Sequence, residues 1–442
     1  MIKAETLRKC ILRDAVMGKM SHQRPEDGNA RDEVKEAIIG EVYGAKIPFD
    51  IPDNWCWVRL GEVCTFVNGR AFKPKEWGKE GLPIVRIQNL NNPHENYNYY
   101  NGTADERFML RGNELLFAWS ASLGVYTWKG GNAVLNQHIF RVEAHDTVLK
   151  EYIQYCLEWR LKDFKNLAHG TTMKHIRKPT LEGVIIPIPP MSEQLRIVSR
   201  FEPILQTLDD LADHQKKLLN ARRILRKSLL KEAIEGKLME HLPDDGDARE
   251  LAREAVIGEF SNEEKLPFEL PANWCWVRLG DIVTLNPRNH LPDDMPVSFL
   301  PMDKLEGGYG SAYTPSVRRW GDVRKGFTHF RDGDIIVAKI TPCFQNRKSA
   351  LVYGLMNGYG AGTTELHVLR ANECADSRYI FWLAKSEYFI NTGANRMQGT
   401  AGQKRWRTCY FRNFLVPLPP LKEQKRIVQK LDAMLATLDE PQ

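Results

Sequence analysis

Basic and amide side chains gather in both halves of this sequence, and their types suit contact with nucleic acid rather than bond-breaking chemistry. Arginine and lysine neutralise phosphates and contact guanine edges, whereas asparagine and glutamine can form paired hydrogen bonds with adenine. One such residue is usually a solvated surface group, so clusters carry more weight than single members. The candidates are Asn68, Arg70, Lys73, Arg86, Gln88, Thr171, Thr172, Lys174, Arg177 and Lys178 in the first half, and Arg318, Arg319, Lys339, Gln345, Arg347, Lys348, Gln403, Lys404, Arg405 and Arg407 in the second.

Two of these clusters lie at equivalent places in the two halves. Gly170, beside the cluster that ends at Lys178, precedes Pro187 by 17 residues, and Gly399 precedes Pro417 by 18. Both prolines belong to a motif that the chain repeats. Equivalent placement therefore favours a shared role for the two clusters.

The usual sequence signatures of catalysis are missing together. There is no GxxxxGK(S/T) phosphate loop, no GxGxxG motif, no HExxH zinc motif and no NPPY-type tetrapeptide of an amino-methyltransferase. Asn286 begins only N-P-R-N, and His138 and His175 have no nucleophile or metal ligand nearby in sequence. The eight cysteines form no CxxC pair. We expect no catalytic residue, no bound metal and no cofactor on this chain.

Length and composition predict a globular chain of more than one domain. The chain has 442 residues, of which 43% are hydrophobic and 27% charged. A formal net charge of +6 permits a polyanionic partner without requiring one. No window is apolar enough for a membrane helix, and the amino terminus does not resemble a secretory signal. We therefore expect a cytoplasmic protein with reduced cysteines and no membrane partner.

An internal repeat dominates the sequence. KIPFDIPDNWCWVRLG at 46–61 matches KLPFELPANWCWVRLG at 265–280, an offset of 219 residues. VIIPIPPMSEQLRIV at 184–198 matches FLVPLPPLKEQKRIV at 414–428, an offset of 230. LRKCILRDAVMGK at 7–19 matches LRKSLLKEAIEGK at 225–237, an offset of 218. The two terminal segments thus add up to nearly one copy of the central segment, which predicts a pseudo-two-fold chain whose termini lie close together.

The central segment has the spacing of a coiled-coil helix. Because proline disrupts a helix interior, Pro203 predicts a short helix from near Ser192 and a separate long one from about Ile204 to Gly236. Similar apolar stripes in the terminal segments predict an antiparallel pair of long helices, although each stripe could instead pack on its own module. The predicted packing residues are Ile204, Leu208, Leu211, Leu218, Leu225 and Leu229, matched by Leu7, Ile11, Met434 and Leu438.

Each repeated border encloses a mixed module, so we expect an α+β fold. Apolar strands follow the Gly turns in LRGNELLFAWS (110–120) and FRDGDIIVAKI (330–340), and both WCWVRLG segments also indicate strands. Residues 151–164 and 378–390 have the pattern of amphipathic helices. The predicted segments are 1–45 (helical arm and linker), 46–190 (first module), 191–240 (central helical arm), 241–264 (linker), 265–420 (second module) and 421–442 (helical arm).

The interiors of the modules, at 68–169 and 287–398, share little sequence inside their similar borders. Recognition of two different short sequences would explain this divergence, and neutral drift after duplication is the alternative.

PxPPxxEQxRIV, present twice, and the arm sequence LRKSLLKEAIEGKL resemble the specificity subunits of Type I restriction-modification systems. The WxWVxLG borders and the strands after GNELL and GDII resemble the target-recognition domains of that family. The resemblance covers the whole chain. It implies two target-recognition domains, each of which reads one half of a bipartite site on double-stranded DNA, and helical arms that set the spacer.

The same resemblance implies partners that carry the chemistry. Such subunits bind methyltransferase subunits, here expected to be two, which modify adenine with S-adenosylmethionine. They also bind restriction subunits that use ATP and Mg²⁺ to translocate and cleave DNA. Two other hypotheses stay open from the sequence: a scaffold or decoy that binds methyltransferase subunits without productive DNA recognition, and an enzyme with an unrecognised site.

Overall fold

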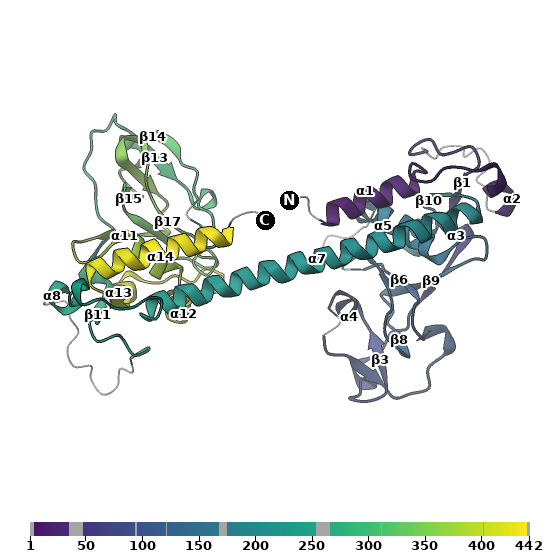
Figure 1. Cartoon of the computed structure of the whole chain (residues 1–442), viewed down its shortest axis with the longest axis horizontal. Coiled ribbons are helices and arrows are strands. Elements are labelled where there is room, and N and C mark those ends of the chain that lie inside the picture. Colours follow the sequence, from purple (N-terminus) through teal and green to yellow (C-terminus); the bar gives the residue numbers. More distant parts are fainter. Residues whose placement is uncertain are drawn as a thin grey trace. The chain divides into compact units, whose positions relative to one another are not determined.

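A computed structural model describes residues 4–34, 47–92, 95–120, 122–167, 175–252, 266–310, 312–400 and 402–439. The chain divides into two compact units, residues 1–216 and 217–442, and the boundary falls inside the longest helix (Figure 1).

The first unit combines helices with three small sheets. One sheet has the antiparallel strand order β2-β9-β6-β7, and a second has the order β4-β3-β8-β5, in which β3 and β8 are parallel. The third pairs β1 with β10. The strands are β1 Cys56–Arg59, β2 Cys64–Asn68, β3 Leu82–Val85, β4 Asn98–Tyr100, β5 Met109–Leu110, β6 Leu115–Ala118, β7 Gly124–Thr127, β8 Ala133–Leu135, β9 Ile139–Ala144 and β10 Ile185–Ile188. The helices are α1 Ala4–Val16, α2 Ala30–Glu33, α3 Leu60–Val63, α4 Ile87–Asn91, α5 Lys150–Leu167, α6 Lys178–Glu182 and the start of α7 Met191–Ile234, which continues into the second unit. Short 3-10 turns cover Pro25–Asp27, Pro74–Glu76 and Glu106–Phe108.

The second unit repeats this topology. Its sheets have the orders β12-β19-β16-β17 and β14-β13-β18-β15, with β13 and β18 parallel, and β11 pairs with β20. The strands are β11 Cys275–Arg278, β12 Val283–Leu285, β13 Pro296–Leu300, β14 Ser316–Arg319, β15 Thr328–Arg331, β16 Ile335–Ala338, β17 Ser349–Leu351, β18 Tyr359–Gly362, β19 Leu366–Ala371 and β20 Leu415–Leu418. The helices are α8 Ala248–Ala252, α9 Leu279–Ile282, α10 Trp320–Val323, α11 Ser377–Lys385, α12 Glu387–Arg396, α13 Thr408–Arg412 and α14 Leu421–Asp439, with 3-10 turns at Pro243–Asp245, Met302–Lys304 and Met356–Gly358. The expected mixed fold with two repeated, sheet-containing modules is confirmed.

The repeated borders form the same local structure in both units. NWCWVRLG supplies β1 and β11, whose partners are the IIPI and LVPL strands that precede each PP pair. A helical turn, α3 or α9, directly follows the four residues of β1 or β11 and interrupts the predicted strand there. Tyr152 and Tyr379 are buried and donate their hydroxyl groups to the carbonyls of Pro187 and Pro417, at 3.1 and 2.7 Å. The borders are therefore part of the core of each unit.

The repeated glycine after each arm segment meets a proline. Gly18 has a φ of +67°, and a Cβ there would lie 2.7 Å from Pro52 Cγ; Gly236 has a φ of +71° and the same relation to Pro271, at 2.3 Å. Positive φ and the absence of space both exclude a side chain. This requirement explains why MGK and EGK share their glycine.

The central arm differs from its prediction, because α7 is one helix of 44 residues with Pro203 inside it. Separate helices before and after Pro203 were expected, and that expectation is wrong. Proline removes one backbone hydrogen bond. Phe201 and Leu205, on either side of it, are only 1% and 4% exposed, so their packing holds the helix together at this point.

A second helix prediction also needs correction. The single helix expected over 378–390 is two helices, α11 and α12, separated at Ser386. Ser386 has a ψ of 153°, and its hydroxyl accepts a hydrogen bond from the Phe389 amide, which begins the second helix. Serine is a favoured helix cap, and it breaks the helix here despite a continuous apolar pattern.

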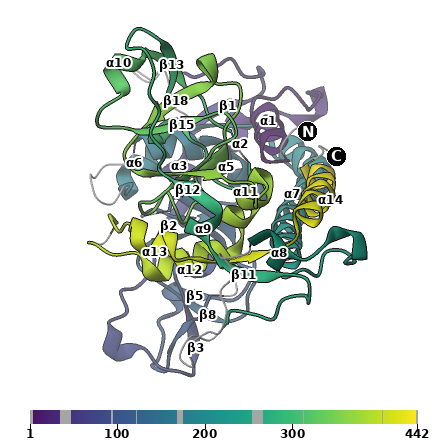
Figure 2. The same ribbon diagram turned by 90° about the vertical axis from the view of Figure 1, so that its left-hand side faces the viewer.

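Some of the predicted packing residues of the helical arms are buried, and others are exposed. Leu229 and Leu438 pack on the core of the second unit, and Figure 2 shows α14 beside the end of α7 in this unit. Ile11 packs on the core of the first unit, and Leu208 is 9% exposed. The mutual antiparallel packing of the arms stays a prediction. The remaining members keep 36–46% of their surface exposed; they are Leu7, Ile204, Leu211, Leu218, Leu225 and Met434.

Candidate nucleic-acid interface

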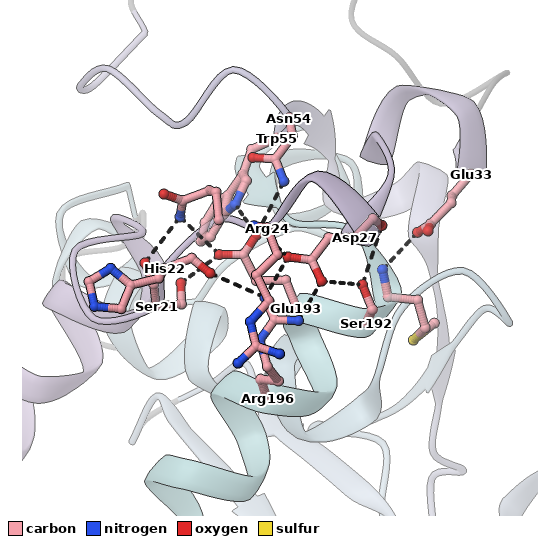
Figure 3. Close-up of polar contacts among 12 residues, drawn as sticks. Ser21, His22, Arg24, Asp27, Glu33, Asn54, Trp55, Ser192, Glu193 and Arg196 are labelled. Carbon is pink, nitrogen blue, oxygen red and sulfur yellow. Dashed lines mark hydrogen bonds and ion pairs between the residues drawn. The ribbon is translucent and has the colours of Figure 1, made fainter.

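The EQxR part of the repeated motif lies in the first turns of α7 and α14, and its glutamate is fully buried in both units. The carboxylate of Glu193 accepts hydrogen bonds from the Trp55 indole and the Gln23 amide, each at 2.9 Å, and from the Ser21 hydroxyl (Figure 3). A buried carboxylate needs several donors to offset its lost hydration. Glu193 therefore ties the chain that follows α1 to the start of α7.

The second unit repeats this contact in part: Asn273 matches Asn54, whose side-chain amide also donates to Glu193, at 3.4 Å, whereas the other donor differs. Glu423 accepts a hydrogen bond from the Asn273 amide at 2.9 Å, and His241 Nδ1 lies 2.6 Å from its other oxygen. His241 is the residue that matches Gln23 in the repeat.

The glutamine of the motif joins three backbone segments. Gln194 accepts a hydrogen bond from the Leu149 amide at 2.8 Å and donates to the Pro189 carbonyl at 2.9 Å. Gln424 does the same with Asp376 and Pro419, at 2.7 and 2.8 Å. Both side chains are fully buried.

The arginine of the motif binds a buried aspartate. Arg196 pairs with Asp27 (Figure 3), and this contact holds the pKa of the Asp27 carboxyl at about 2. Arg426 pairs with Asp245 in the second unit. All three motif side chains are committed to the protein's own structure, so the motif that marks the repeat contributes architecture and no free binding group.

A different set of residues sits at the ends of the central strands. In the first unit the Trp119 carbonyl accepts from the Ile176 amide at 3.0 Å, the Trp119 amide donates to the His138 carbonyl at 3.2 Å, and Ser120 forms a β-bridge with His175. Trp119 lies between the end of β6 and Ser120, and His138 directly precedes β9. We call Trp119, His138 and His175 the strand-end triad of the first unit.

The second unit repeats these backbone contacts with other residue types. The Lys339 carbonyl accepts from the Trp406 amide at 2.9 Å, the Lys339 amide donates to the Glu365 carbonyl at 2.9 Å, and Ile340 bridges to Arg405. Lys339, Glu365 and Arg405 thus form the equivalent strand-end triad. One backbone frame presents tryptophan and two histidines in one unit, and a lysine, a glutamate and an arginine in the other.

The Trp119 and His138 side chains of the first triad form an aromatic pair. The Trp119 indole donates to Asn68 Oδ1 at 3.1 Å, and its ring lies 5.4 Å from that of His138. Burial lowers the pKa of His138, so its imidazole is neutral at pH 7. Asn68, predicted from the sequence, therefore belongs to this site. Nitrogens and flat ring faces here suit hydrogen bonding and stacking rather than charge neutralisation.

The second triad is ionic. Arg405 Nη2 lies 2.8 Å from Glu365 Oε1 in a two-pronged contact, and Lys339 lies at the same strand end. Gln403, Lys404 and Arg407, all predicted, are exposed beside Arg405 along the same segment. The Thr341 hydroxyl accepts a hydrogen bond from the Lys404 amide at 3.0 Å, which fastens this segment to the strand end.

The corresponding segment of the first unit is described only in part. Arg177 is exposed, and Lys178 donates its Nζ to the Phe66 carbonyl at 2.9 Å. Thr171, Thr172 and Lys174 lie outside the described residues, and their role stays a prediction.

Other predicted residues of the first unit lie around the sheet that contains β3. Arg70 pairs with Glu76 and lies over the ring of Tyr100, at 5.0 Å from its centroid. Arg86 lies 5.3 Å from the centroid of the Trp77 ring, which is 40% exposed. Lys73 and Gln88 are exposed.

In the second unit the predicted residues divide into two groups. Arg318 and Arg319 are exposed on β14, and Gln345 is exposed in the turn after β16. Arg347, by contrast, pairs with Glu387, and Lys348 donates its Nζ to the Met302 carbonyl at 2.9 Å. Internal contacts of this kind favour a structural role for Arg347 and Lys348.

Trp119, His138, His175 and Glu365 were absent from the predicted set. Alignment of LRGNELLFAWS with FRDGDIIVAKI already placed Trp119 opposite Lys339. His175 and Arg405 both precede the repeated proline by 12 residues, so the offset of 230 pairs them as well. The equivalence of His138 and Glu365 depends on loops of different length, so only the backbone contacts reveal it.

No group of three or more His, Cys, Asp or Glu side chains in the described ranges is arranged to hold a metal ion. None of the helices described is both long and apolar enough to cross a membrane.

Two modules of one topology, with different side chains on one repeated frame, define a duplicated recognition protein. The family model described as "Type I restriction modification DNA specificity domain" matches residues 52–221 and again 271–440. The chain therefore belongs to the family of Type I restriction-modification specificity proteins, as the sequence resemblance predicted.

Individual relatives give the extent of the similarity. The specificity subunit of the Type I restriction enzyme EcoAI of Escherichia coli is 39% identical over 235 residues, which cover 49% of this chain and 40% of that protein. The EcoBI specificity subunit of the same species is 21% identical over 427 residues, covering 92% of this chain and 84% of that one. A crystal structure of the S subunit from M. genitalium has a TM-score of 0.44 and 16% identity, and the match covers 88% of this chain and 93% of that chain. The matches to the EcoAI and EcoEI subunits thus span only about two fifths of those proteins.

Proposed function

We propose that this chain is the DNA-recognition subunit of a Type I restriction-modification complex, in which each unit reads one half of a bipartite site. One observation carries the proposal: the two strand-end triads occupy the same backbone frame and differ in all three side chains. A protein that binds one repeated sequence would have no use for this difference. Membership in the specificity-domain family supports DNA as the ligand.

The helical arms would set the spacer and dock the methyltransferase subunits. Uninterrupted helix over the 44 residues of α7 corresponds to about 66 Å of rise, whereas one turn of B-DNA is about 34–36 Å. Four leucines and isoleucines of α7 keep about two fifths of their surface exposed and are available for packing against another helix; they are Ile204, Leu211, Leu218 and Leu225.

The complex would divide its chemistry among subunits. Two methyltransferase subunits would bind S-adenosylmethionine, and restriction subunits would bind ATP and Mg²⁺, whereas this chain would be noncatalytic, without a cofactor of its own, and cytoplasmic. Neither the fold nor the family match supports a scaffold or decoy that lacks DNA recognition.

Selection from random DNA tests the proposal. The full chain, co-purified with methyltransferase subunits, is incubated with duplexes that contain a long randomised segment, and the bound fraction is sequenced. We expect two short fixed sequences separated by a spacer of constant length. A single short sequence, or no enrichment at physiological salt, would contradict the proposed function.

A further inference from the structure

Arg405 is held in one orientation by its neighbours. Its Nε lies 3.0 Å from Glu365 Oε2, its Nη2 lies 2.8 Å from Glu365 Oε1, and its Nη1 donates to the Gln403 carbonyl at 3.1 Å. The Arg405 side chain nevertheless keeps 43% of its surface exposed, against 26% for Glu365. The guanidinium is therefore both fixed and accessible.

The backbone of Arg405 is fixed as well. Its amide donates to the Gln398 carbonyl at 2.9 Å, and its carbonyl accepts from the Gln398 amide at 3.1 Å. The next residue, Trp406, is fully buried and donates its amide to Lys339. Arg405 is thus fixed by two backbone hydrogen bonds and by the buried residue next to it. Its side chain would therefore lose little conformational entropy on binding a ligand.

The Arg405 guanidinium keeps N–H groups that its protein partners do not use. A guanidinium has five N–H groups. Glu365 takes two and the Gln403 carbonyl takes one, so one N–H remains on each terminal nitrogen within the described part of the chain. Two N–H groups on the two terminal nitrogens match the O6 and N7 acceptors of guanine in the major groove.

The surroundings favour DNA as the source of these acceptors. Lys404 and Arg407 are exposed on the same short segment, and Lys339 lies at the strand end to which that segment is bonded. These cations attract phosphates, while Glu365 is already occupied by Arg405.

We propose that Arg405 reads a guanine in the half-site of the second unit, and that Glu365 is its positioning residue. The proposal rests on the proposed function and adds to it the base and the residue. Because His175 occupies the equivalent position in the first unit, the first unit does not read guanine by this contact.

Three variants test the assignment in the selection described above. Arg405→Lys keeps the charge but loses the fork, Glu365→Gln keeps the shape but loses the ionic clamp, and Arg407→Ala is the control. Arg407 is an exposed arginine two residues away. Folding of each variant is checked by its unfolding midpoint, and binding is measured on the selected duplex and on duplexes with single substitutions in each half.

We expect Arg405→Lys to reduce the preference for one guanine in the second half-site by roughly 5- to 150-fold, with every other position unchanged. Glu365→Gln should weaken the same preference by a smaller factor. Arg407→Ala should weaken binding to all sequences evenly and lower the dependence on salt, as loss of a phosphate contact does.

The outcomes separate the two proposals. If the wild-type chain selects no split sequence, the proposed function fails. If it selects one whose second half lacks guanine, or if Arg405→Lys weakens all sequences equally, the guanine assignment fails alone. A lowered unfolding midpoint in Glu365→Gln with an unchanged base preference would show that Glu365 only stabilises the fold.

Discussion

His367 should make the second unit sensitive to acid. It is fully buried on β19, where its Nε2 lies 2.9 Å from the Trp406 carbonyl oxygen and its Nδ1 lies 3.4 Å from the amide nitrogen of Asn286. Burial lowers the pKa of His367 to about 4, against an ordinary value of 6.5. The folded state therefore holds a neutral imidazole, whereas the unfolded chain takes up a proton as the pH falls below 6.5.

The sign and size of the effect follow from this difference. Above pH 6.5 the imidazole of His367 is neutral in both the folded and the unfolded state, so it does not lower the free energy of unfolding. As the pH falls from 6.5 towards about 4, the unfolded state binds the proton that the folded state refuses, so the free energy of unfolding decreases. The loss is about 2 kcal/mol at pH 5 and about 3 kcal/mol once the pH is well below the folded-state value.

The first unit supplies the matched replacement. Phe140 lies opposite Phe117 in β6, and His367 lies opposite Val337 at the same register in β16. His367→Phe should keep the packing and remove the titrating group. Urea unfolding of both proteins at pH 7.5 and pH 5.0 gives the comparison, because all other groups titrate alike and cancel in the difference.

We expect His367→Phe to lower the free energy of unfolding by about 1–3 kcal/mol at pH 7.5, because the Trp406 carbonyl and the Asn286 amide each lose a hydrogen-bond partner. Between pH 7.5 and pH 5.0 the difference between the two proteins should shift by about 2 kcal/mol in favour of the variant. If wild type and His367→Phe lost the same free energy of unfolding between pH 7.5 and pH 5.0, the reasoning would be refuted.

Three further predictions concern the frame and the modules. Asp27→Asn should lower the free energy of unfolding of the first unit by about 2 kcal/mol, because it removes a contribution that wild type has above pH 3.8 and loses as the pH falls to about 2. Urea unfolding checks this, and the control is Asp14→Asn, at a half-buried surface ion pair, which we expect to cost under about 0.5 kcal/mol. Gly18→Ala should lower stability by about 1–3 kcal/mol, and by more than Gly28→Ala, because Gly28 shares the positive φ but has no atom within 4 Å of a Cβ; equal losses would exclude the contact with Pro52 as a cause. Replacing residues 68–169 with those of a relative should change one half-site of the modified DNA sequence and leave the other intact, as methylation mapping would show.

The repeat in the sequence was enough to predict the duplicated mixed fold, because the border residues are themselves the core. Trp55 and Trp274 are nearly or fully buried, and the strands they precede pair as their repeated apolar pattern suggests. Local exceptions were harder to predict. Ser386 ends α11 inside an apolar pattern, whereas Pro203 does not end α7, since packing at Phe201 and Leu205 outweighs one missing hydrogen bond.

The candidate site was predictable by residue type but not by position. Clusters around Arg177 and Arg405 were found from their charge and spacing, yet nothing in the sequence pairs Arg405 with Glu365, 40 residues away. That contact exists because β19 and the segment before α13 both meet the end of β16. Conversely, Arg347 and Lys348 have the composition of a surface cluster, and only their internal partners favour a structural role; their predicted contact with DNA stays a prediction.

Main-chain hydrogen bonds hold the backbone frame of the two strand-end triads, and main-chain groups are the same in every amino acid except proline. Under the proposed function, a point mutation at these positions would therefore exchange one base contact for another while the main-chain frame stays in place. A new DNA preference would then need only single substitutions. Because each unit has its own copy of this frame, one half-site would change while the other continued to be read, so the two half-sites would vary independently rather than as one complete target.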